Sequence, residues 1–481
     1  MGLRQFDIQL NQFSAEASLR CDTDFIDFSR TPKEKSFSFG DLFDVVECEK
    51  KDRLALIDDI ENTPFQYSEI GNVTKQGDVE AVTLDFSTRD ELVEDYFKKI
   101  EKGDIQTAQA GNILLSKVRP NLKKYVLIDN DLTDVFYTTA LIQLRPKKLN
   151  KLLYYSLRTI FYSNLMSISR QGKGYPTLKV DDLFCIKLDS NVINTFENNE
   201  QSLLEKIEPI EKNIRKLKTK IKAPQEAINR VFAREFNFNL ERFETLKKVK
   251  IFDIDFYNFG NNKDLRKSVK FHRQAGQFVL DELKSKTSKK IKDFIDEPIV
   301  LGKGISPTQY DDDNGDNYYL SMATIKNWKF EKDNARLVTD KFATDNENKK
   351  VQNDDILLAR SGEGTIGKVA IIDDEELKGV FADFTMRIRF KDYNCLFAYY
   401  YFRTEYFQYL VEINKKGLGN NTNIFPSQIQ EFPLLDISKE EQHRIVDEIK
   451  IELDAQEKIK IEIEKERNKI DAIIENAIKN S

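Results

Sequence analysis

Two long segments of the chain carry recurring apolar residues, and in the first of them the steps alternate between three and four positions. One begins at Ile207 and the other at Ile445, and charged residues fill most of the positions between the apolar ones. This spacing predicts helices that each carry one continuous apolar seam. The expected seam residues are Ile207, Ile210, Ile214, Leu217, Ile221, Ile445, Ile449, Leu453, Ile463, Ile470 and Ile474.

Each of these helices is expected to pack against the other. A helix of about 40 residues is roughly 60 Å long, which exceeds the width of a domain of this size. Packing each seam on its own domain is the simpler alternative, but two such seams in one chain favour an antiparallel coiled coil. Pro224 predicts a kink or stop near Ala223, because proline inside a helix costs about 3 kcal/mol. Pro209 fits a first helical turn, and Ser438 with Glu441 forms a capping-box pattern before the second helix.

A glycine-rich stretch at 354–372, "DDILLARSGEGTIGKVAII", contains the pattern GxGxxG from Gly362 to Gly367. A phosphate-binding loop of this kind needs a strand before it and a helix after it. The residues that follow, Val369–Ile372, are β-rich, and Val369 after Lys368 does not complete the P-loop pattern. Strand, glycine turn and strand therefore predict a hairpin.

The chain repeats itself with a period of about 245 residues, or half its length. "QAGNILLSKV" at 109–118 recurs as "QNDDILLARS" at 352–361, and "YSEIGNV" at 67–73 recurs loosely as "YLSMATI" at 319–325. Shorter matches keep the same order, which indicates a duplication: Leu19-Arg20 with Leu265-Arg266, Val135-Phe136 with Val380-Phe381, Leu157-Arg158-Thr159 with Phe402-Arg403-Thr404, "GKG" at 172–174 with "GLG" at 417–419, and Glu200-Gln201 with Glu441-Gln442. We expect an α+β protein with mixed α/β domains at 1–190 and 237–436, and helical regions at 191–236 and 437–481.

Composition narrows the classes of function. The 481 residues include 34 Phe and 18 Tyr, which is enough for several hydrophobic cores. The net charge of −6 does not indicate a nucleic-acid-binding protein, although such binding depends on a local basic face rather than on net charge. The four cysteines show no CxxC spacing, and the two histidines are far apart, so we expect no metal site and no cofactor. The chain lacks an apolar run of signal-peptide or membrane-spanning length, which predicts a cytoplasmic protein without a membrane partner.

The arrangement of globular domain, long helix, globular domain and long helix resembles the specificity subunit of type I restriction–modification systems. The motifs that carry the resemblance are "DDILLARSGEGTIGKVAII" and "PLLDISKEEQHRIVDEI", and it covers essentially the whole chain. It implies two target-recognition domains that each read half of a bipartite DNA sequence, and a coiled coil that sets the gap. It also implies a non-catalytic subunit whose partners are double-stranded DNA, two adenine-N6 methyltransferase subunits and two restriction subunits.

The first half departs from the glycine pattern, because Ser116-Lys117-Val118-Arg119-Pro120 stands where the second half has its glycine turn. This difference is expected if the two loops read different bases. DNA binding needs cations for phosphate and side chains that reach base edges. The candidate DNA-binding residues are Lys117, Arg119, Lys123, Lys124, Arg170, Lys173, Tyr175, Arg360, Ser361, Lys368, Lys415, Lys416, Asn420 and Asn421. Each of them is alternatively a surface lysine or a turn residue, and for Arg158 and Arg403 we favour structural pairing.

Two other functions are weighed against DNA recognition. A coiled-coil interaction scaffold without DNA specificity agrees with the slightly acidic net charge. A stand-alone enzyme is disfavoured, because an amino-methyltransferase needs a D/N-P-P-[FYW] tetrapeptide and the chain contains no Pro-Pro pair. Any methylation would then be performed by another chain.

Overall fold

The computed structural model describes residues 36–87, 94–171, 175–249, 251–260, 266, 268–332, 335–362, 364–417 and 422–479. The predicted matches at Leu19-Arg20, 172–174 and 417–419 include residues outside this part. The chain forms two compact units. Unit 1 comprises Met1–Thr219 with Ile461–Ser481, and unit 2 comprises Lys220–Lys460. Each unit therefore includes one portion of the helical region predicted at 191–236 and one portion of the region predicted at 437–481.

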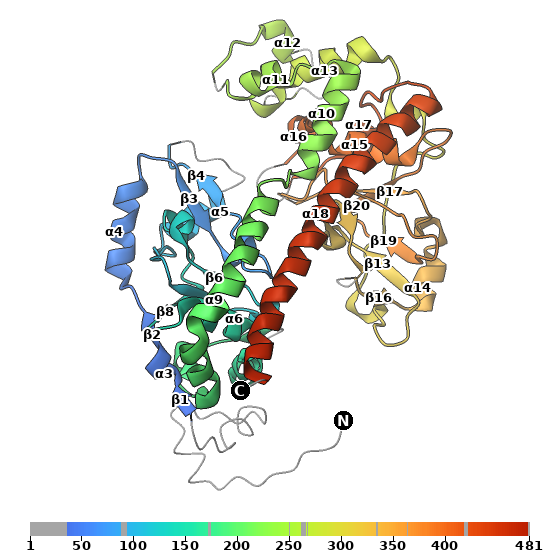
Figure 1. Ribbon diagram of the computed structural model, residues 1–481. Coiled ribbons are helices and arrows are strands. Elements are labelled where there is room, and N and C mark those ends of the chain that lie inside the picture. Colours follow the sequence, from blue (N-terminus) through green and yellow to red (C-terminus); the bar gives the residue numbers. More distant parts are fainter. Residues whose placement is uncertain are drawn as a thin grey trace. The chain divides into compact units, whose positions relative to one another are not determined.

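Unit 1 contains a four-stranded antiparallel sheet and a three-stranded mixed sheet (Figure 1). The first has the order β2-β8-β5-β6, from strands β2 (Phe43–Val46), β8 (Leu141–Pro146), β5 (Ile113–Ser116) and β6 (Tyr125–Leu127). The second has the order β4-β3-β7, with β3 and β7 parallel, from β4 (Val82–Leu84), β3 (Phe65–Ser68) and β7 (Val135–Tyr137). Two-stranded pairs are β1 (Ser36–Ser38) with β11 (Lys187–Asp189) and β9 (Arg170–Gln171) with β10 (Pro176–Thr177).

Unit 2 repeats these strand orders. Its four-stranded sheet is β12-β20-β17-β18, from β12 (Val300–Leu301), β20 (Thr385–Ile388), β17 (Ile356–Ala359) and β18 (Val369–Ile371). Its three-stranded sheet is β16-β13-β19, again with one parallel pair, from β16 (Leu337–Val338), β13 (Asn317–Leu320) and β19 (Gly379–Phe381). Strands β14 (Ile325–Lys326) and β15 (Lys329–Phe330) pair separately. The central pairing agrees in register, because Leu115 lies opposite Ile142 in unit 1 and Leu358 lies opposite Met386 in unit 2.

Helices follow the last sheet strand in the same sequence in both units. In unit 1 they are α6 (Asn150–Arg158) and α7 (Tyr162–Ile168), and in unit 2 they are α15 (Cys395–Arg403) and α16 (Glu405–Asn414). The chain is therefore a mixed α/β protein. The remaining described α-helices are α3 (Phe39–Leu42), α4 (Lys50–Ile60), α5 (Glu94–Ile100), α8 (Val180–Leu183), α11 (Leu240–Lys247), α12 (Phe256–Gly260), α13 (Gln274–Lys286), α14 (Asp340–Asp345) and α17 (Pro426–Ile429).

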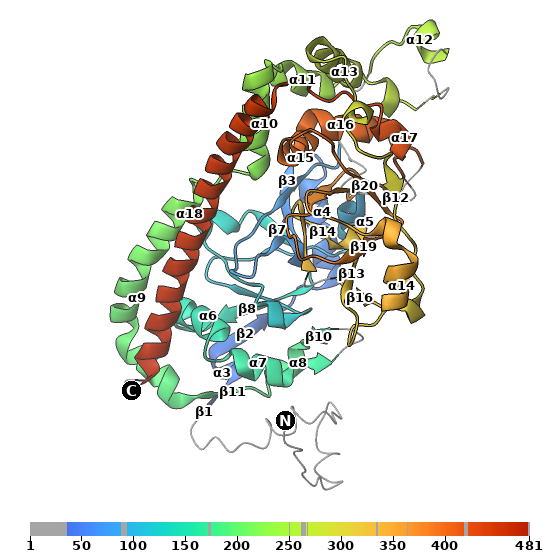
Figure 2. The same cartoon turned by 90° about the vertical axis from the view of Figure 1, so that its right-hand side faces the viewer.

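The two predicted helical regions form the helices α9 (Ser190–Lys218), α10 (Pro224–Phe236) and α18 (Lys439–Lys479). Within unit 1, α9 and the end of α18 lie side by side and run in opposite directions (Figures 1 and 2). Within unit 2, α10 pairs with the first half of α18 through Arg230–Glu452 and Arg234–Glu448. A step of four residues forward on α10 corresponds to four residues backward on α18, so this pair is also antiparallel.

The globular parts hold these helices through polar contacts. In unit 1, Glu211 on α9 accepts from Lys151 Nζ at 2.7 Å and from Tyr155 Oη at 2.8 Å. In unit 2, Gln225 Oε1 on α10 accepts from Nε of Arg403 at 3.1 Å and from its Nη2 at 2.9 Å. Arg158 donates to the carbonyls of Lys75 and Lys123. The structural pairing predicted for Arg158 and Arg403 is confirmed.

Most predicted seam residues are buried, and one prediction is wrong. Ile207, Ile214, Leu217, Ile445, Ile449, Ile463, Ile470 and Ile474 are at most 7% exposed, while Ile210 and Leu453 are partly buried. Ile221 lies between α9 and α10 and is 36% exposed, because the helix ends at Lys218 and restarts at Pro224. The stop predicted near Ala223 is thus confirmed. Pro209 lies inside α9 rather than in a first turn.

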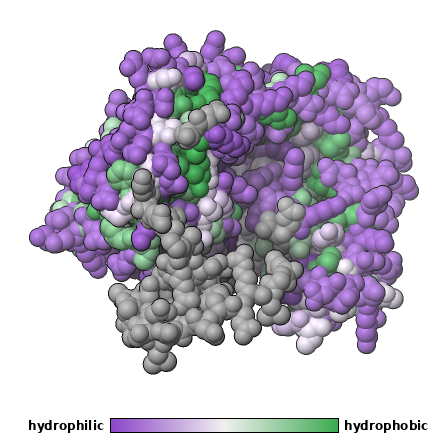
Figure 3. All heavy atoms as spheres, turned by 60° about the horizontal axis from the view of Figure 1, so that its bottom comes forward, coloured by the Kyte–Doolittle hydropathy of each residue, from purple (hydrophilic) through white to green (hydrophobic). Residues whose placement is uncertain are grey.

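The start of α18 agrees with the predicted cap, since Glu441 N donates to Ser438 Oγ at 3.2 Å. The largest core belongs to unit 2, where the helix α15, "CLFAYYYFR", is buried almost throughout, with Phe402 and Phe407 stacked at 4.4 Å. Hydrophilic side chains dominate the face in Figure 3, and hydrophobic ones form limited patches there. Among the residues described, no helix is long and apolar enough to cross a membrane.

Candidate nucleic-acid interface

The glycine-rich stretch forms the predicted hairpin. Strand β17 pairs antiparallel with β18, so that Leu358 lies opposite Val369, and a strand rather than a helix follows the glycines. Gly362, Gly364 and Gly367 all have positive φ, between 74° and 86°. The turn therefore lacks the helix N-terminus on which a phosphate-binding loop of this class depends.

The residue after the hairpin's first strand has the same backbone bonds in both units. In unit 1, Lys117 N donates to Ala140 O at 3.0 Å, and Lys117 O accepts from Leu178 N at 2.8 Å. In unit 2, Arg360 N donates to Phe384 O at 3.0 Å, and Arg360 O accepts from Ile424 N at 2.9 Å. We call this place the strand-end position. It presents a cationic side chain in each unit, in surroundings that differ.

The turn that follows is also comparable in the two units. Arg119 (φ 52°) and Gly362 (φ 84°) each stand two residues after the strand-end position. Glycine adopts this left-handed conformation without strain, whereas other residues pay roughly 1–2 kcal/mol. Strain of this kind persists mainly at functional sites. Unit 1 thus places an exposed arginine, 5.2 Å from the ring of Tyr175, where unit 2 has glycine.

A cavity of about 450 Å³ lies elsewhere in unit 1, beside α9 and the end of α18. The pKa values of two carboxyl groups in its wall are shifted in opposite directions. Burial alone would raise the pKa of Asp78, but ion pairs with Lys218 and Arg467 hold that pKa below its ordinary value. Burial raises the pKa of Asp471, which has no ion-pair partner among the described residues. The residues that line this cavity include parts of α9 and α18 but not the strand-end position.

A smaller cavity of about 210 Å³ adjoins the strand-end position in unit 1. It contains two cationic side chains, Arg53 from α4 and Lys117, and neither has an ion-pair partner among the described residues. Arg53 Nε is buried without a hydrogen-bond partner, and Lys117 Nζ donates only to Thr139 O, at 2.7 Å. Burial, and next the nearby Arg53, lower the pKa of Lys117. Glu47 also lines this cavity and acts on that pKa in the opposite direction, but less strongly than Arg53. Two cations against one carboxylate leave a positive balance, so an anion bound there would be stabilised.

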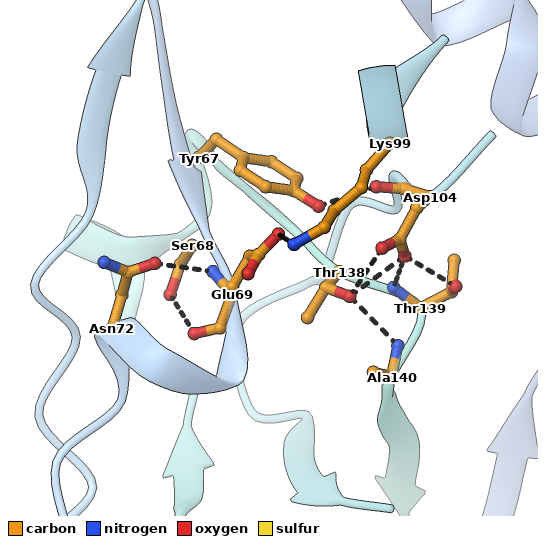
Figure 4. A network of polar contacts seen from close by, with 9 residues as sticks. All are labelled: Tyr67, Ser68, Glu69, Asn72, Lys99, Asp104, Thr138, Thr139 and Ala140. Atoms are coloured by element: carbon orange, nitrogen blue, oxygen red, sulfur yellow. Dashed lines mark hydrogen bonds and ion pairs between the residues drawn. The ribbon is translucent and has the colours of Figure 1, made fainter. Parts of the chain in front are cut away.

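A polar network supports the loop over this cavity (Figure 4). The carboxylate of Asp104 accepts from Thr139 N and Thr139 Oγ1, both at 2.7 Å, and from Thr138 Oγ1 at 2.9 Å. Tyr67 Oη donates to Asp104 O at 2.8 Å, which ties this network to β3. The carbonyls of Thr139 and Ala140 that contact Lys117 therefore belong to a fixed segment.

In unit 2 the side chain at the strand-end position has aromatic neighbours instead. The guanidinium carbon of Arg360 lies 5.9 Å from the ring centre of Phe384 and 5.8 Å from that of Phe425. The two rings are 47% and 39% exposed. The same backbone frame thus carries a polar cationic cavity in unit 1 and an arginine beside two phenylalanines in unit 2.

Several predicted DNA-binding residues have partners within their own unit. Arg170 donates to both carboxylate oxygens of Asp182, at 2.6 and 2.8 Å, and Asp182 is 1% exposed. Lys415 is buried and pairs with Glu412 at 2.7 Å. Lys123 Nζ and Lys124 Nζ donate to the carbonyls of Arg158 and Ile70 at 2.9 and 2.7 Å. Their contacts with DNA stay predictions.

The other predicted residues divide by exposure. Tyr175 is 41% exposed, Lys368 and Lys416 are half-buried, and Ser361 is buried with its Oγ donating to Thr422 O at 3.2 Å. Ser361, the residue after Arg360, and Lys416 both pair with Asn423 in unit 2. Arg266 donates to the carbonyls of Asn414 and Lys415, which gives it a structural role. Lys173, Asn420 and Asn421 lie outside the described residues.

Sequence reasoning missed Arg53, Phe384 and Phe425 at these sites. Arg53 comes from a helix some sixty residues before Lys117, and nothing in the local pattern connects the two. The phenylalanines are apolar, and apolar residues between strands are ordinarily assigned to the core. The backbone hydrogen bonds place Phe384 opposite Ala140, whereas the sequence match of Val135-Phe136 with Val380-Phe381 sets the halves one residue out of this register.

Comparisons with known proteins give matches only among solved structures. No family model matches the chain, and no curated protein matches it. The HsdS subunit from Thermoanaerobacter tengcongensis is 14% identical, with 93% of this chain and 97% of that chain covered and a TM-score of 0.30. The S subunit of a type I restriction-modification system from M. genitalium is 13% identical, with 92% and 95% covered and a TM-score of 0.37. A chain from a structure concerned with complex assembly and conformational transition of the type I R-M system is 14% identical, with 92% and 97% covered and a TM-score of 0.38. These structures are what the chain is similar to, and its function is inferred from its own motifs and geometry.

Proposed function

We propose that this chain is the non-catalytic specificity subunit of a type I restriction–modification complex. Its two units are duplicated target-recognition domains, and each reads one half of a bipartite DNA target. The observation that carries the proposal is the strand-end position, where identical backbone bonds present different cationic surroundings in the two units. A duplicated reader with unequal side chains is what recognition of two different half-sites requires.

The helices have a separate role in this proposal. Helices α9 and α10 form an antiparallel coiled coil with α18, which sets the gap between the half-sites and carries the partner subunits. Two methyltransferase subunits methylate adenine at N6, and two restriction subunits join them to cleave DNA. The antiparallel ion pairs and the buried seam support the coiled coil.

A scaffold that binds proteins and not DNA is the second candidate. The observation in its favour is a run of exposed apolar side chains in unit 2, with Ile251 94%, Phe256 85% and Tyr257 70% exposed. Exposed apolar groups of this kind mark protein-binding surfaces. They agree equally with docking of a methyltransferase subunit, so they do not exclude DNA recognition.

Methylation mapping tests the proposal. The chain is co-expressed with the methyltransferase encoded beside it in a host without adenine methylation, and N6-methyladenine is mapped by long-read sequencing. We expect two short half-sites separated by a fixed gap, and no such pattern from the methyltransferase alone. Replacing 237–436 by the same region of a homologue should change one half-site only. An assembled complex that produces no sequence-specific methylation would contradict DNA recognition and favour the scaffold.

A further inference from the structure

Phe384 and Phe425 both lie beside Arg360 while remaining exposed to solvent. Both rings lie within 6 Å of the guanidinium carbon, and both lose less than two thirds of their surface to the protein. Rings that serve the core are buried far more deeply, as Phe402 and Phe407 are in the same unit. Core packing therefore does not explain this pair.

Arg360 differs from Arg389 and Arg403 of unit 2 in having no polar partner among the described residues. Arg389 donates to both oxygens of Asp355, at 2.8 Å each, and Arg403 donates to Gln225. The guanidinium of Arg360 makes no hydrogen bond or ion pair among the described residues, and its Nε is buried. A partly desolvated cation without acceptors is unfavourable unless a ligand supplies them.

A second unsatisfied group lies at the same edge. Thr422 Oγ1 is buried and has no hydrogen-bond partner in the described part of the chain. Its backbone carbonyl accepts from the hydroxyl of Ser361, the residue after Arg360. The site therefore combines polar groups that lack acceptors or donors with exposed apolar rings.

We infer that Arg360, with the rings of Phe384 and Phe425 beside it, reads a guanine in the half-site bound by unit 2. This inference rests on the proposed DNA-recognition function and names the base chemistry of that site. A guanidinium pairs with guanine O6 and N7 through two parallel hydrogen bonds, which is the commonest specific contact in the major groove. The neighbouring rings restrict the space open to the guanidinium before binding, so that less rotamer entropy is lost. The ring edges are available for the methyl group of a neighbouring thymine.

Unit 1 has other side chains at the corresponding positions. The hydrogen bonds that align Lys117 with Arg360 also align Ala140 with Phe384 and place Lys179, after Leu178, opposite Phe425 after Ile424. Neither aromatic ring is present in unit 1. The Arg360 cluster is thus specific to one half-site.

Two substitutions test the inference in the full methyltransferase complex. R360K keeps the charge but loses the planar pair of donors. F384A removes one ring and installs the residue that unit 1 has at this position. R336K is the matched control, because Arg336 also stacks on a ring, 3.8 Å from the centre of Tyr310, but pairs with Asp312 at 2.8 Å and lies outside the site.

The readout is the methylated motif, together with competition binding of duplexes altered at single positions. With R360K we expect guanine discrimination to fall by about 5- to 150-fold at one position of the unit 2 half-site. F384A should weaken the same position, and R336K should leave the motif unchanged. Each variant counts as folded if it still reads the unit 1 half-site normally and its thermal unfolding midpoint is unchanged.

Each outcome bears on the inference. An unchanged motif in folded R360K and F384A overturns it and leaves the proposed function standing. A loss of affinity that is equal for all sequences assigns Arg360 to a phosphate and also overturns it. If the unaltered complex assembles but makes no bipartite motif, the proposed function itself is wrong.

Discussion

Lys123 in unit 1 and Gly367 in unit 2 occupy the same point of the hairpin, two residues before its second strand, and both have positive φ, 51° and 86°. In unit 1 the lysine offsets its backbone strain through its side chain, which donates to Arg158 O and lies 4.2 Å from the ring of Tyr162. In unit 2 a side chain would be crowded, because a Cβ at Gly367 would lie 2.9 Å from Gln408 Oε1 and 3.0 Å from Val411 Cγ1. The two units reach one backbone conformation by different means.

Gly367→Ala should therefore destabilise unit 2 more than Gly364→Ala does. Both positions have positive φ, but a Cβ at Gly364 would meet nothing within 4 Å. We expect Gly364→Ala to cost about 1 kcal/mol from backbone strain alone, and Gly367→Ala to cost about 2–4 kcal/mol because crowding is added. Urea unfolding measures both free energies. Equal losses would mean that the packing around Gly367 relaxes freely.

Asp78→Asn and Asp471→Asn should change the stability of unit 1 in opposite directions. The lowered pKa of Asp78 means that its ion pairs stabilise the fold above about pH 4, and that this contribution is lost as pH falls through the folded-state pKa. Asp78→Asn should cost about 1–2 kcal/mol at pH 7, a value reduced because Lys218 is 39% exposed.

The carboxylate of Asp471 should affect stability in the opposite direction. Its raised pKa means that the folded state favours the protonated carboxyl, so a penalty appears as pH rises through that value. Asp471→Asn should remove the penalty and raise the unfolding free energy at pH 7, with no gain at low pH. Unfolding by urea at several pH values measures both variants, and Asp131→Asn, at an exposed position of the same cavity, serves as the control. A destabilised Asp471→Asn variant would show that this carboxylate has a cationic partner in solution.

The sequence predicted local features of the fold better than the sites. The hairpin at 354–372 followed from β-rich segments around glycines, and the stop before Pro224 followed from the geometry of proline. Ile221 was assigned wrongly because its spacing continues the seam although the helix has already ended. Pro209 is accommodated within α9, since the long helix is held by tertiary packing on both sides of it. The surroundings of Lys117 and Arg360 depend on contacts between distant segments, such as Arg53 with Lys117, which no local pattern encodes.

Arg170→Gln should destabilise unit 1 by about 3 kcal/mol, because it leaves the buried carboxylate of Asp182 without its two donors. The comparable change Arg336→Gln breaks a pair whose side chains are both about half exposed and should cost much less, because exposed ion pairs contribute little to stability. Urea unfolding compares the two variants. A fully stable Arg170→Gln protein with an altered half-site would instead support the predicted contact of Arg170 with DNA.

Arg53→Gln should weaken DNA binding equally for all sequences, if the cavity beside Lys117 receives a backbone phosphate. Each neutralised phosphate contributes about one unit to the slope of log affinity against log salt concentration. We therefore expect the slope to become shallower by about 1 in Arg53→Gln, and Lys117→Gln should act similarly because both cations face one cavity. Fluorescence anisotropy with a labelled target duplex at several salt concentrations measures the slope. Lys102→Gln, which removes an exposed lysine away from the cavity, should leave it almost unchanged. If Arg53→Gln behaves like this control, the cavity binds no phosphate, whereas a changed half-site would mean that Arg53 contacts a base.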